Sequence, residues 1–351
     1  MHPQIAARLY DAPLLIHPEK AEIIAWALRD KLTPDIEIAG PSGPDASRFM
    51  GTRRRANGYA LTRATKGVAL IPVLGSLVNR GAWLDSRSGL TAYEGLDAQF
   101  KEAGSDPEIH SIVIDMDTPG GEAGGMFKLV STIQRVARSK RVIAVVDDMA
   151  ASAGYGIASA AHEIVVSPTS VVGSIGVVMI HLDRSGQFAD AGVKPTLIFA
   201  GRHKVDGHPF GPLPPEVIAD KQRQIGVIYG QFVETVAAGR GARTTAQKAR
   251  ETEARVYIGN DAVKAGLADR IGSLDQVIAE LSGGKPGRGA PSGARAAANS
   301  DQKAGAGWQK AFAIANAKAG FPDKPEPSRA TPAWGKAIAE ANRRFGGSDG
   351  R

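Results

Sequence analysis

A serine near the middle of the chain lies where a nucleophile could be activated. The apolar run RVIAVV at residues 141–146 predicts a buried strand, and the small residues of 151–160 predict a short helix. Ser152 therefore falls where the strand gives way to the helix. The N–H of Ala153, at the start of that helix, is free to donate to an oxyanion. Taken alone, a serine among alanines and glycines is more often a packing or capping residue.

Two other segments could supply the rest of a nucleophilic site. The run SIVIDM at 111–116 predicts a strand that ends in a Pro-Gly-Gly turn, where the N–H of Gly121 is a second candidate oxyanion donor. A predicted strand at 196–199 leads to Lys204, a candidate general base. A lysine accepts a proton only when it is largely neutral, which burial favours. Alone, Pro-Gly-Gly is an ordinary turn and a lysine an ordinary surface residue, as Lys194 is expected to be.

A histidine base is the competing arrangement. The chain has seven histidines, at positions 2, 17, 110, 162, 181, 203 and 208. His162 is expected at the end of the short helix and His181 after a strand. His203 adjoins Lys204 and would point to the opposite side of an extended segment. The residue types alone therefore leave both a Ser-Lys pair and a Ser-His arrangement open.

Apolar runs alternate with amphipathic stretches from residue 67 to about residue 281. Strands are expected at 67–73, 111–116, 141–146, 164–166, 176–180 and 196–199, and helices at 93–103, after the Pro-Gly-Gly turn to about 138, at 151–160 and at 214–238. This alternation is typical of an α/β layered domain with a largely parallel, buried sheet. Before it, a helix beginning at Pro18 and a Pro- and Gly-rich stretch at 34–64 indicate an arm and a linker.

Composition narrows the classes of function. With 43% hydrophobic and 23% charged residues, the 351-residue chain has an ordinary globular composition. It has no cysteine, which excludes disulfides, thiolate metal sites and a cysteine nucleophile. The net charge of +7 belongs to residues 282–351, which hold 12 basic and 5 acidic residues, whereas residues 1–281 hold 31 of each. The body is therefore not expected to bind nucleic acid.

The two ends of the chain carry different signals. The N-terminus has no signal-peptide pattern, and no apolar run approaches the roughly 18 residues that span a bilayer, so a cytoplasmic protein is expected. Low-complexity sequence at 282–300 predicts a flexible linker. Beyond it, WQKAFAIAN at 308–316 is repeated as WGKAIAEAN at 334–342. These repeats are either frayed helices on a disordered tail or peptides that fold on a partner.

Five ordered motifs between about residues 67 and 280 resemble the signal peptide peptidase A family of serine peptidases, in particular its phage protein C branch of head-maturation proteases. The matching segments are 149–155 (MAASAGY), 172–177 (VGSIGV), 200–204 (AGRHK) with 209–214 (PFGPLP), 255–259 (RVYIG) and 265–269 (AGLAD). The resemblance implies that Ser152 is the nucleophile, Lys204 its general base and Ser174 the residue that positions the lysine. The N–H groups of Gly121 and Ala153 would form the oxyanion hole. Many relatives have a glycine where Ala153 stands, but the N–H is retained.

The resemblance also carries expectations about architecture. It implies a crotonase-like or Clp-protease-like spiral of strand–strand–helix units, with an N-terminal helical arm and a flexible C-terminal tail. The expected divisions are an arm at 1–64, a Ser-Lys peptidase domain at 65–281 and a basic tail at 282–351. Related protomers usually form rings, so a homo-oligomer around a shared chamber is expected. Neither a cofactor nor a metal is required by the expected chemistry.

The expected activity is peptide-bond hydrolysis through an acyl-enzyme, during prohead maturation, on scaffold, capsid or portal-associated proteins. The expected location is the host cytoplasm or the procapsid interior. Three alternatives stay open. One is a cytoplasmic enzyme that digests small peptides, as bacterial signal peptide peptidases do. The second is a crotonase-type acyl-CoA enzyme, and the third is a non-catalytic assembly or scaffold protein.

Overall fold

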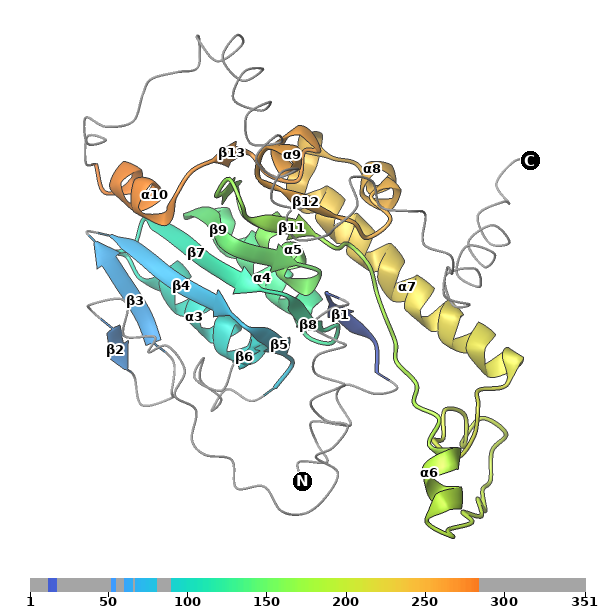
Figure 1. Cartoon of the computed structure of the whole chain (residues 1–351). Coiled ribbons are helices and arrows are strands. Elements are labelled where there is room, and N and C mark those ends of the chain that lie inside the picture. The colour runs from blue at the N-terminus through green and yellow to red at the C-terminus, as the bar shows by residue number, and fades with distance from the viewer. Residues whose placement is uncertain (1–11, 18–51, 55–59, 66, 81–89, 284–351) are drawn as a thin grey trace, which may run out of the picture. The chain divides into compact units, whose positions relative to one another are not determined.

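The protein has a mixed α/β architecture. The computed structural model describes residues 12–17, 52–54, 60–65, 67–80 and 90–283 (Figure 1). The chain divides into compact units of residues 1–286 and 287–351, and the second unit lies outside the described residues. The helix expected to begin at Pro18 and the two tail repeats also lie outside the described residues.

The larger sheet has nine strands and forms the centre of the first unit. Its strand order is β12-β11-β9-β7-β4-β3-β2, with β10 and β13 paired beside β9. The strands are β2 (Thr52–Arg54), β3 (Ala60–Thr65), β4 (Val68–Leu74), β7 (Ser111–Thr118), β9 (Arg141–Ala151), β10 (Glu163–Val166), β11 (Val171–Gly173), β12 (Val256–Ile258) and β13 (Arg270–Ile271). Strands β4, β7 and β9 run parallel, and β9 pairs in parallel with both β10 and β11 along different parts of its length.

A smaller sheet of four strands lies at the carboxyl ends of the central strands. It contains β1 (Leu14–Ile16), β8 (Gly120–Glu122), β5 (Ser76–Val78) and β6 (Leu90–Ala92), in the order β1-β8-β5-β6. Strand β5 follows β4 directly, and β8 follows β7. Because the ends of parallel strands gather at one edge of a sheet, this small sheet lies where ligands bind in many α/β proteins.

Alternate residues of the central strands face two separate apolar cores. In β4, Ala69, Ile71 and Val73 belong to the larger core, whereas Val68 and Leu70 belong to the smaller one. The larger core is shared with helices α3 (Tyr93–Ser105), α4 (Met126–Ala137) and α5 (Ala153–Ser159), and the smaller one with α10 (Leu274–Leu281). Strands buried on both faces read as continuous apolar runs, which explains why the sequence predicted β4, β7 and β9 correctly.

Helix α7 (Pro215–Arg240) is the longest helix of the described part. Its C-terminal half buries Phe232 and Val236 in the larger core, whereas Ile218 and Val227 nearer its start are exposed. It is preceded by α6 (Ser185–Asp190) and followed by η3 (Gly241–Arg243), α8 (Ala246–Glu251) and α9 (Gly259–Lys264). In Figure 1, α7 extends from the sheet towards α6. Within the described residues, no helix combines the length and apolar character needed to span a membrane.

The structure corrects some predicted elements. The strand expected at 196–199 is irregular and exposed, because no neighbouring strand pairs with it in the described part of the chain. The strand expected at 176–180 is reduced to isolated bridging, with Val178 paired to Leu14. Conversely, β2 and most of β3 lie inside the stretch interpreted as a linker, and β3 extends the main sheet through its antiparallel pairing with β4.

Candidate functional site

Ser152 lies at a sharp turn between β9 and α5. Its backbone φ of 54° and ψ of −117° are strained for any residue with a side chain. Its N–H donates to the Gly173 carbonyl at 2.9 Å, and its carbonyl accepts from the Gly156 N–H at 3.0 Å, so both sides of the turn are held. The residue is 1% exposed, and its Oγ lies 3.5 Å from the Gly176 carbonyl oxygen. A strained strand-to-helix turn of this kind is a recognised way to present a nucleophilic serine.

The Pro-Gly-Gly segment lies against this turn. Thr118 at the end of β7 is paired with Ala150 in β9, which brings β8 beside the serine. A Cβ on Gly120, whose φ is 95°, would stand 3.0 Å from the Ala153 nitrogen, and a Cβ on Gly121 would stand 1.9 Å from the Leu77 carbonyl oxygen. Both positions therefore accept only glycine. The structure thus brings the segments of both expected oxyanion donors, Gly121 and Ala153, next to the serine.

Ser174 lies on the other side of the serine turn. Strand β11 pairs with the end of β9 so that Gly173 is opposite Ala151, and Ser174 follows immediately. Ser174 is 4% exposed, has a φ of 53° and donates its N–H to the Arg255 carbonyl at 2.9 Å. The described non-glycine residues with positive φ are Ser152, Ser174, Glu253 and Ala254. Backbone strain is therefore concentrated around the nucleophile and the segment that holds Ser174, as is common at functional sites.

Lys204 is not brought to the serine within this chain. It lies in an exposed turn within the segment 179–214. From here on, we use the name arm for this segment alone and not for the N-terminal stretch. No residue of the arm is buried, and in the described part of the chain no hydrogen bond joins Lys204 to Ser152. Figure 1 shows the arm around α6 extending away from β9 and α5, beyond the end of α7. Lys194, the other lysine of the arm, is exposed as the sequence predicted.

The arm is held by contacts of its own and presents apolar side chains outward. Phe188 and Phe210 meet edge to face with ring centroids 5.1 Å apart, and the Arg184 N–H donates to the Pro209 carbonyl at 2.8 Å. Exposed fractions are 48% for Val193, 38% for Leu197, 96% for Ile198 and 52% for Phe199. Such a contiguous apolar run at the surface is typical of an interface with another protein.

Three of the described histidines have partners other than Ser152. His162 Nδ1 accepts from the Val142 N–H at 3.0 Å, and His203 Nδ1 lies 2.9 Å from an Asp206 carboxylate oxygen. His181 Nε2 lies 3.4 Å from the Gly211 carbonyl oxygen. In the described residues, the serine hydroxyl makes no hydrogen bond to a histidine, so the geometry gives no support to a Ser-His pair.

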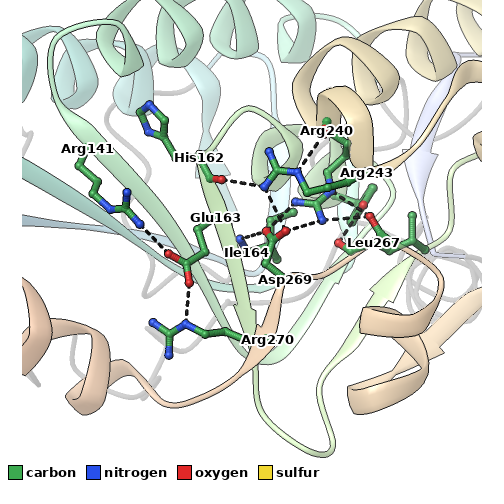
Figure 2. Close-up of polar contacts among 11 residues, drawn as sticks. Arg141, His162, Glu163, Ile164, Arg240, Arg243, Leu267, Asp269 and Arg270 are labelled. Carbon is green, nitrogen blue, oxygen red and sulfur yellow. Dashed lines mark hydrogen bonds and ion pairs between the residues drawn. The ribbon is translucent and has the colours of Figure 1, made fainter. Parts of the chain in front are cut away.

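A buried ion pair links the end of α7 to β10 (Figure 2). Arg240, at the end of α7 and 0% exposed, donates to both carboxylate oxygens of Asp269 at 2.8 and 3.0 Å. Arg243 donates to the same carboxylate at 3.0 Å, and the Ile164 N–H also donates to it, at 2.7 Å. Burial alone would raise the pKa of Asp269, but these hydrogen bonds and the charge of Arg240 outweigh it and hold the pKa below its usual value.

This ion pair is linked to the helix that begins after the nucleophile. Tyr155, on the first turn of α5, is 0% exposed and donates its hydroxyl to the Leu267 carbonyl at 2.9 Å. Leu267 and Asp269 both belong to the AGLAD motif at 265–269. Burial raises the pKa of the Tyr155 hydroxyl, which therefore stays a hydrogen-bond donor at neutral pH. The motif thus has a clear structural role, which is to join α5, α7 and β10.

Sequence reasoning missed several strands of the site: β8 was expected as a turn, and neither β11 nor β1 was expected. Strand β1 pairs with β8 beside Gly120 and Gly121. The available signal was the run LLI between Pro13 and Pro18, a short apolar stretch bounded by prolines. Such a run is too short to indicate its partner, because only the folded chain shows which strand it joins.

The strain at Ser152 predicts a difference between two inactive variants. Ser152→Gly is expected to be more stable to unfolding than Ser152→Ala by about 1–2 kcal/mol, because glycine adopts a positive φ without a Cβ penalty. Denaturant unfolding of the two purified chains measures the difference. The control is the same pair of substitutions at Ser159, in the following helix, where glycine is expected to be the less stable. Equal stability of the two Ser152 variants would contradict the strain.

A strained serine turn flanked by backbone N–H groups defines a serine hydrolase site. The model of peptidase family S49 matches residues 134–286. The chain is 36% identical over 305 residues to capsid assembly protease C of Escherichia phage lambda, which covers 81% of this chain and 68% of that protein. It is 35% identical over 287 residues to head-tail preconnector protein GP5 of Enterobacteria phage P21, covering 79% of this chain and 56% of that protein.

A bacterial relative is also similar. The putative signal peptide peptidase SppA of Enterococcus faecium is 28% identical over 187 residues, covering 52% of this chain and 53% of that protein. The chain belongs to peptidase family S49. It is a serine peptidase, as the ordered motifs predicted.

Proposed function

We propose that this chain is an endopeptidase in which Ser152 attacks the peptide bond and Lys204 is the general base. The serine Oγ would add to the carbonyl carbon while its proton passes to the lysine Nζ. The N–H groups of Gly121 and Ala153 would hold the oxyanion, and the lysine would return the proton to the leaving amine. Water would then hydrolyse the acyl-enzyme by the same steps. Ser174, at the strained turn beside the nucleophile, would position the lysine.

The single observation that supports this proposal best is the conformation of Ser152. Its φ of 54° costs stability and is held by hydrogen bonds on both sides of the turn. A packing or capping serine has no need of such a conformation. The two glycine positions against the turn, where a side chain would clash, support the oxyanion role of Gly121.

The exposed position of Lys204 supports a second part of the proposal. A lysine is a general base only where water is largely excluded, and one copy of the chain does not provide that environment. We propose a homo-oligomeric ring in which the apolar residues of the arm pack on a neighbouring copy. The arm would then place Lys204 at the Ser152 of that copy. Burial of Ile198 and Phe199 at the interface would stabilise the contact.

The relatives support a role in capsid assembly. Two of the most similar proteins are a phage capsid assembly protease and a phage head-tail preconnector protein. We propose that this chain cleaves scaffold, capsid or portal-associated proteins inside the procapsid. The parallel sheet with helices on both faces also supports the finer assignment of a crotonase-like or Clp-like spiral, with a peptidase domain at 65–281 between an N-terminal stretch at 1–64 and a basic tail at 282–351.

Co-expression with the neighbouring capsid proteins tests this role. Wild-type chain is expected to yield shortened capsid-associated proteins, whereas Ser152→Ala chain is expected to leave them at full length. Mass spectrometry of the purified assemblies identifies the cleavage sites. Normal head assembly with the Ser152→Ala chain would instead support a non-catalytic scaffold role.

A further inference from the structure

Strand β1 lies between the two segments that flank the nucleophile. On one side it pairs antiparallel with β8, with Leu15 opposite Gly121. On the other side the Leu14 N–H donates to the Val178 carbonyl at 2.8 Å, and the Val178 N–H donates to the Leu14 carbonyl at 2.9 Å. Figure 1 shows β1 beside β8 in the small sheet. A peptide bound by strand addition is likewise extended and held by main-chain hydrogen bonds.

The carbonyl of Leu15 lies beside the first expected oxyanion donor, because Leu15 is opposite Gly121 in the sheet. Two hydrogen bonds lie on either side of the Leu15–Gly121 pair. The Ala123 N–H donates to the Pro13 carbonyl at 3.3 Å, and the His17 N–H donates to the Pro119 carbonyl at 2.8 Å. Antiparallel pairing alternates, so Leu15 and Gly121 form a pair of the hydrogen-bonded kind, and the Gly121 N–H faces the Leu15 carbonyl.

The second expected donor, Ala153, lies close to the neighbouring glycine. A Cβ on Gly120 would stand 2.2 Å from the Leu15 carbonyl oxygen and 3.0 Å from the Ala153 nitrogen. The Leu15 carbonyl oxygen and the Ala153 nitrogen therefore both lie against Gly120.

The side chains of β1 are buried as those of a bound peptide would be. Leu15 is 0% exposed and belongs to the larger apolar core, while Leu14 and Ile16 are 3% and 5% exposed. Ser152 itself is 1% exposed, so no external peptide reaches its Oγ in this arrangement. A segment must move before a substrate binds, and β1 is the segment that fills the strand position.

We propose that β1 occupies the substrate strand position of the peptidase, so that the chain holds its own site closed until β1 leaves. The inference rests on the proposed role of Ser152. A substrate takes the antiparallel register of β1 against β8, with its scissile carbonyl at the place of the Leu15 carbonyl. The residue before the scissile bond then enters the apolar site that Leu15 fills, so extended peptides with a large aliphatic residue there are the preferred class.

A reversible disulfide lock tests the proposal. Leu14 and Glu122 are opposite each other in a pair of the non-hydrogen-bonded kind, whose Cα atoms lie about 4.5 Å apart, within the range of a disulfide. The chain has no cysteine, so Leu14→Cys with Glu122→Cys creates a single possible intramolecular disulfide. Labelling of Ser152 by a leucyl peptide phosphonate is measured in the full-length chain before and after reduction. The two single-cysteine variants are the matched controls.

The lock is expected to lower labelling by about tenfold or more when oxidised, because a disulfide removes the open population, and reduction is expected to restore it. Equal labelling in the oxidised and reduced forms would overturn the proposal. Absence of labelling both in folded wild-type chain and in folded chain whose β1 docking is weakened by Leu15→Ala would overturn the assignment of Ser152, and this inference with it, so the two failures are distinct.

A second variant does not depend on disulfide geometry. Leu15→Ala weakens the docking of β1 and is expected to increase the rate of labelling. Leu96→Ala removes an equally buried leucine of the same core from α3 and is expected to give no increase. An unchanged or lower rate for Leu15→Ala in a folded chain would show that β1 is a fixed structural strand.

Discussion

Ser152→Ala chain and Lys204→Ala chain are each expected to be inactive alone, and a mixture of the two is expected to regain peptidase activity. Each loss is expected to be on the order of 10³–10⁶ in kcat, the range for removal of a nucleophile or its base. Recovery on mixing is what the proposed oligomer requires, because Lys204 lies on the exposed arm whereas Ser152 is buried in the body. In a mixed oligomer, the intact arm of one chain meets the intact serine of the other.

Two further lysine variants sharpen this experiment. Lys204→Arg keeps the charge but cannot accept a proton, so it is expected to be as inactive as Lys204→Ala. Lys194→Ala, which changes the other exposed lysine of the arm, is expected to retain activity. If mixed oligomers form without recovery, the arm delivers its lysine to its own serine. Near-normal turnover by Lys204→Ala would show that another group is the base.

The central strands could be predicted from the sequence because strands buried on both faces are apolar throughout. Runs such as SIVIDM at 111–116 and RVIAVV at 141–146 are apolar throughout, since both faces of their strands are covered. The same reasoning was wrong for the arm, where it predicted a strand at 196–199. Residues 196–199 have an apolar composition similar to that of a buried strand, but Ile198 is 96% exposed. An apolar run shows that a segment is to be buried, and it does not show whether its own chain or another covers it.

The candidate site, too, could be predicted from the sequence only in part. The turn at Ser152 could be predicted because a strand, a serine and a small-residue helix are consecutive in the sequence. The position of Gly121 followed from the end of the neighbouring strand. The strand position of β1 could not be predicted, because its pairing with β8 joins segments more than 100 residues apart. In the proposed oligomer, the place of Lys204 relative to the serine depends on a second copy, and no local sequence pattern records that contact.

Replacement of Arg240 by methionine is expected to lower the free energy of unfolding by about 3–5 kcal/mol, because it leaves the Asp269 carboxylate partly buried without its main partner. The double variant Arg240→Met with Asp269→Leu is expected to recover part of this loss, since it removes both charges. Denaturant unfolding of the single and double variants measures both effects. The control pair is Lys264 and Asp261, which are 77% and 73% exposed and whose replacement is expected to change stability little.

The same ion pair gives a pH dependence with a definite sign. The pKa of Asp269 is lower in the folded chain than its ordinary value of about 3.9, so its ionised form stabilises the fold above that pH. This contribution is lost as the pH falls below about 4 and the carboxylate takes up a proton. The stability difference between wild-type and Asp269→Asn chains is therefore expected to be largest at neutral pH and to shrink in acid. A difference that grew towards low pH would show that Asp269 is not held in its ionised form. Asp269 joins the end of α7 to β10, and Leu267 of the same motif accepts the Tyr155 hydroxyl from the helix after Ser152. Loss of this charge is therefore also expected to loosen the link between α7 and the helix that carries Tyr155.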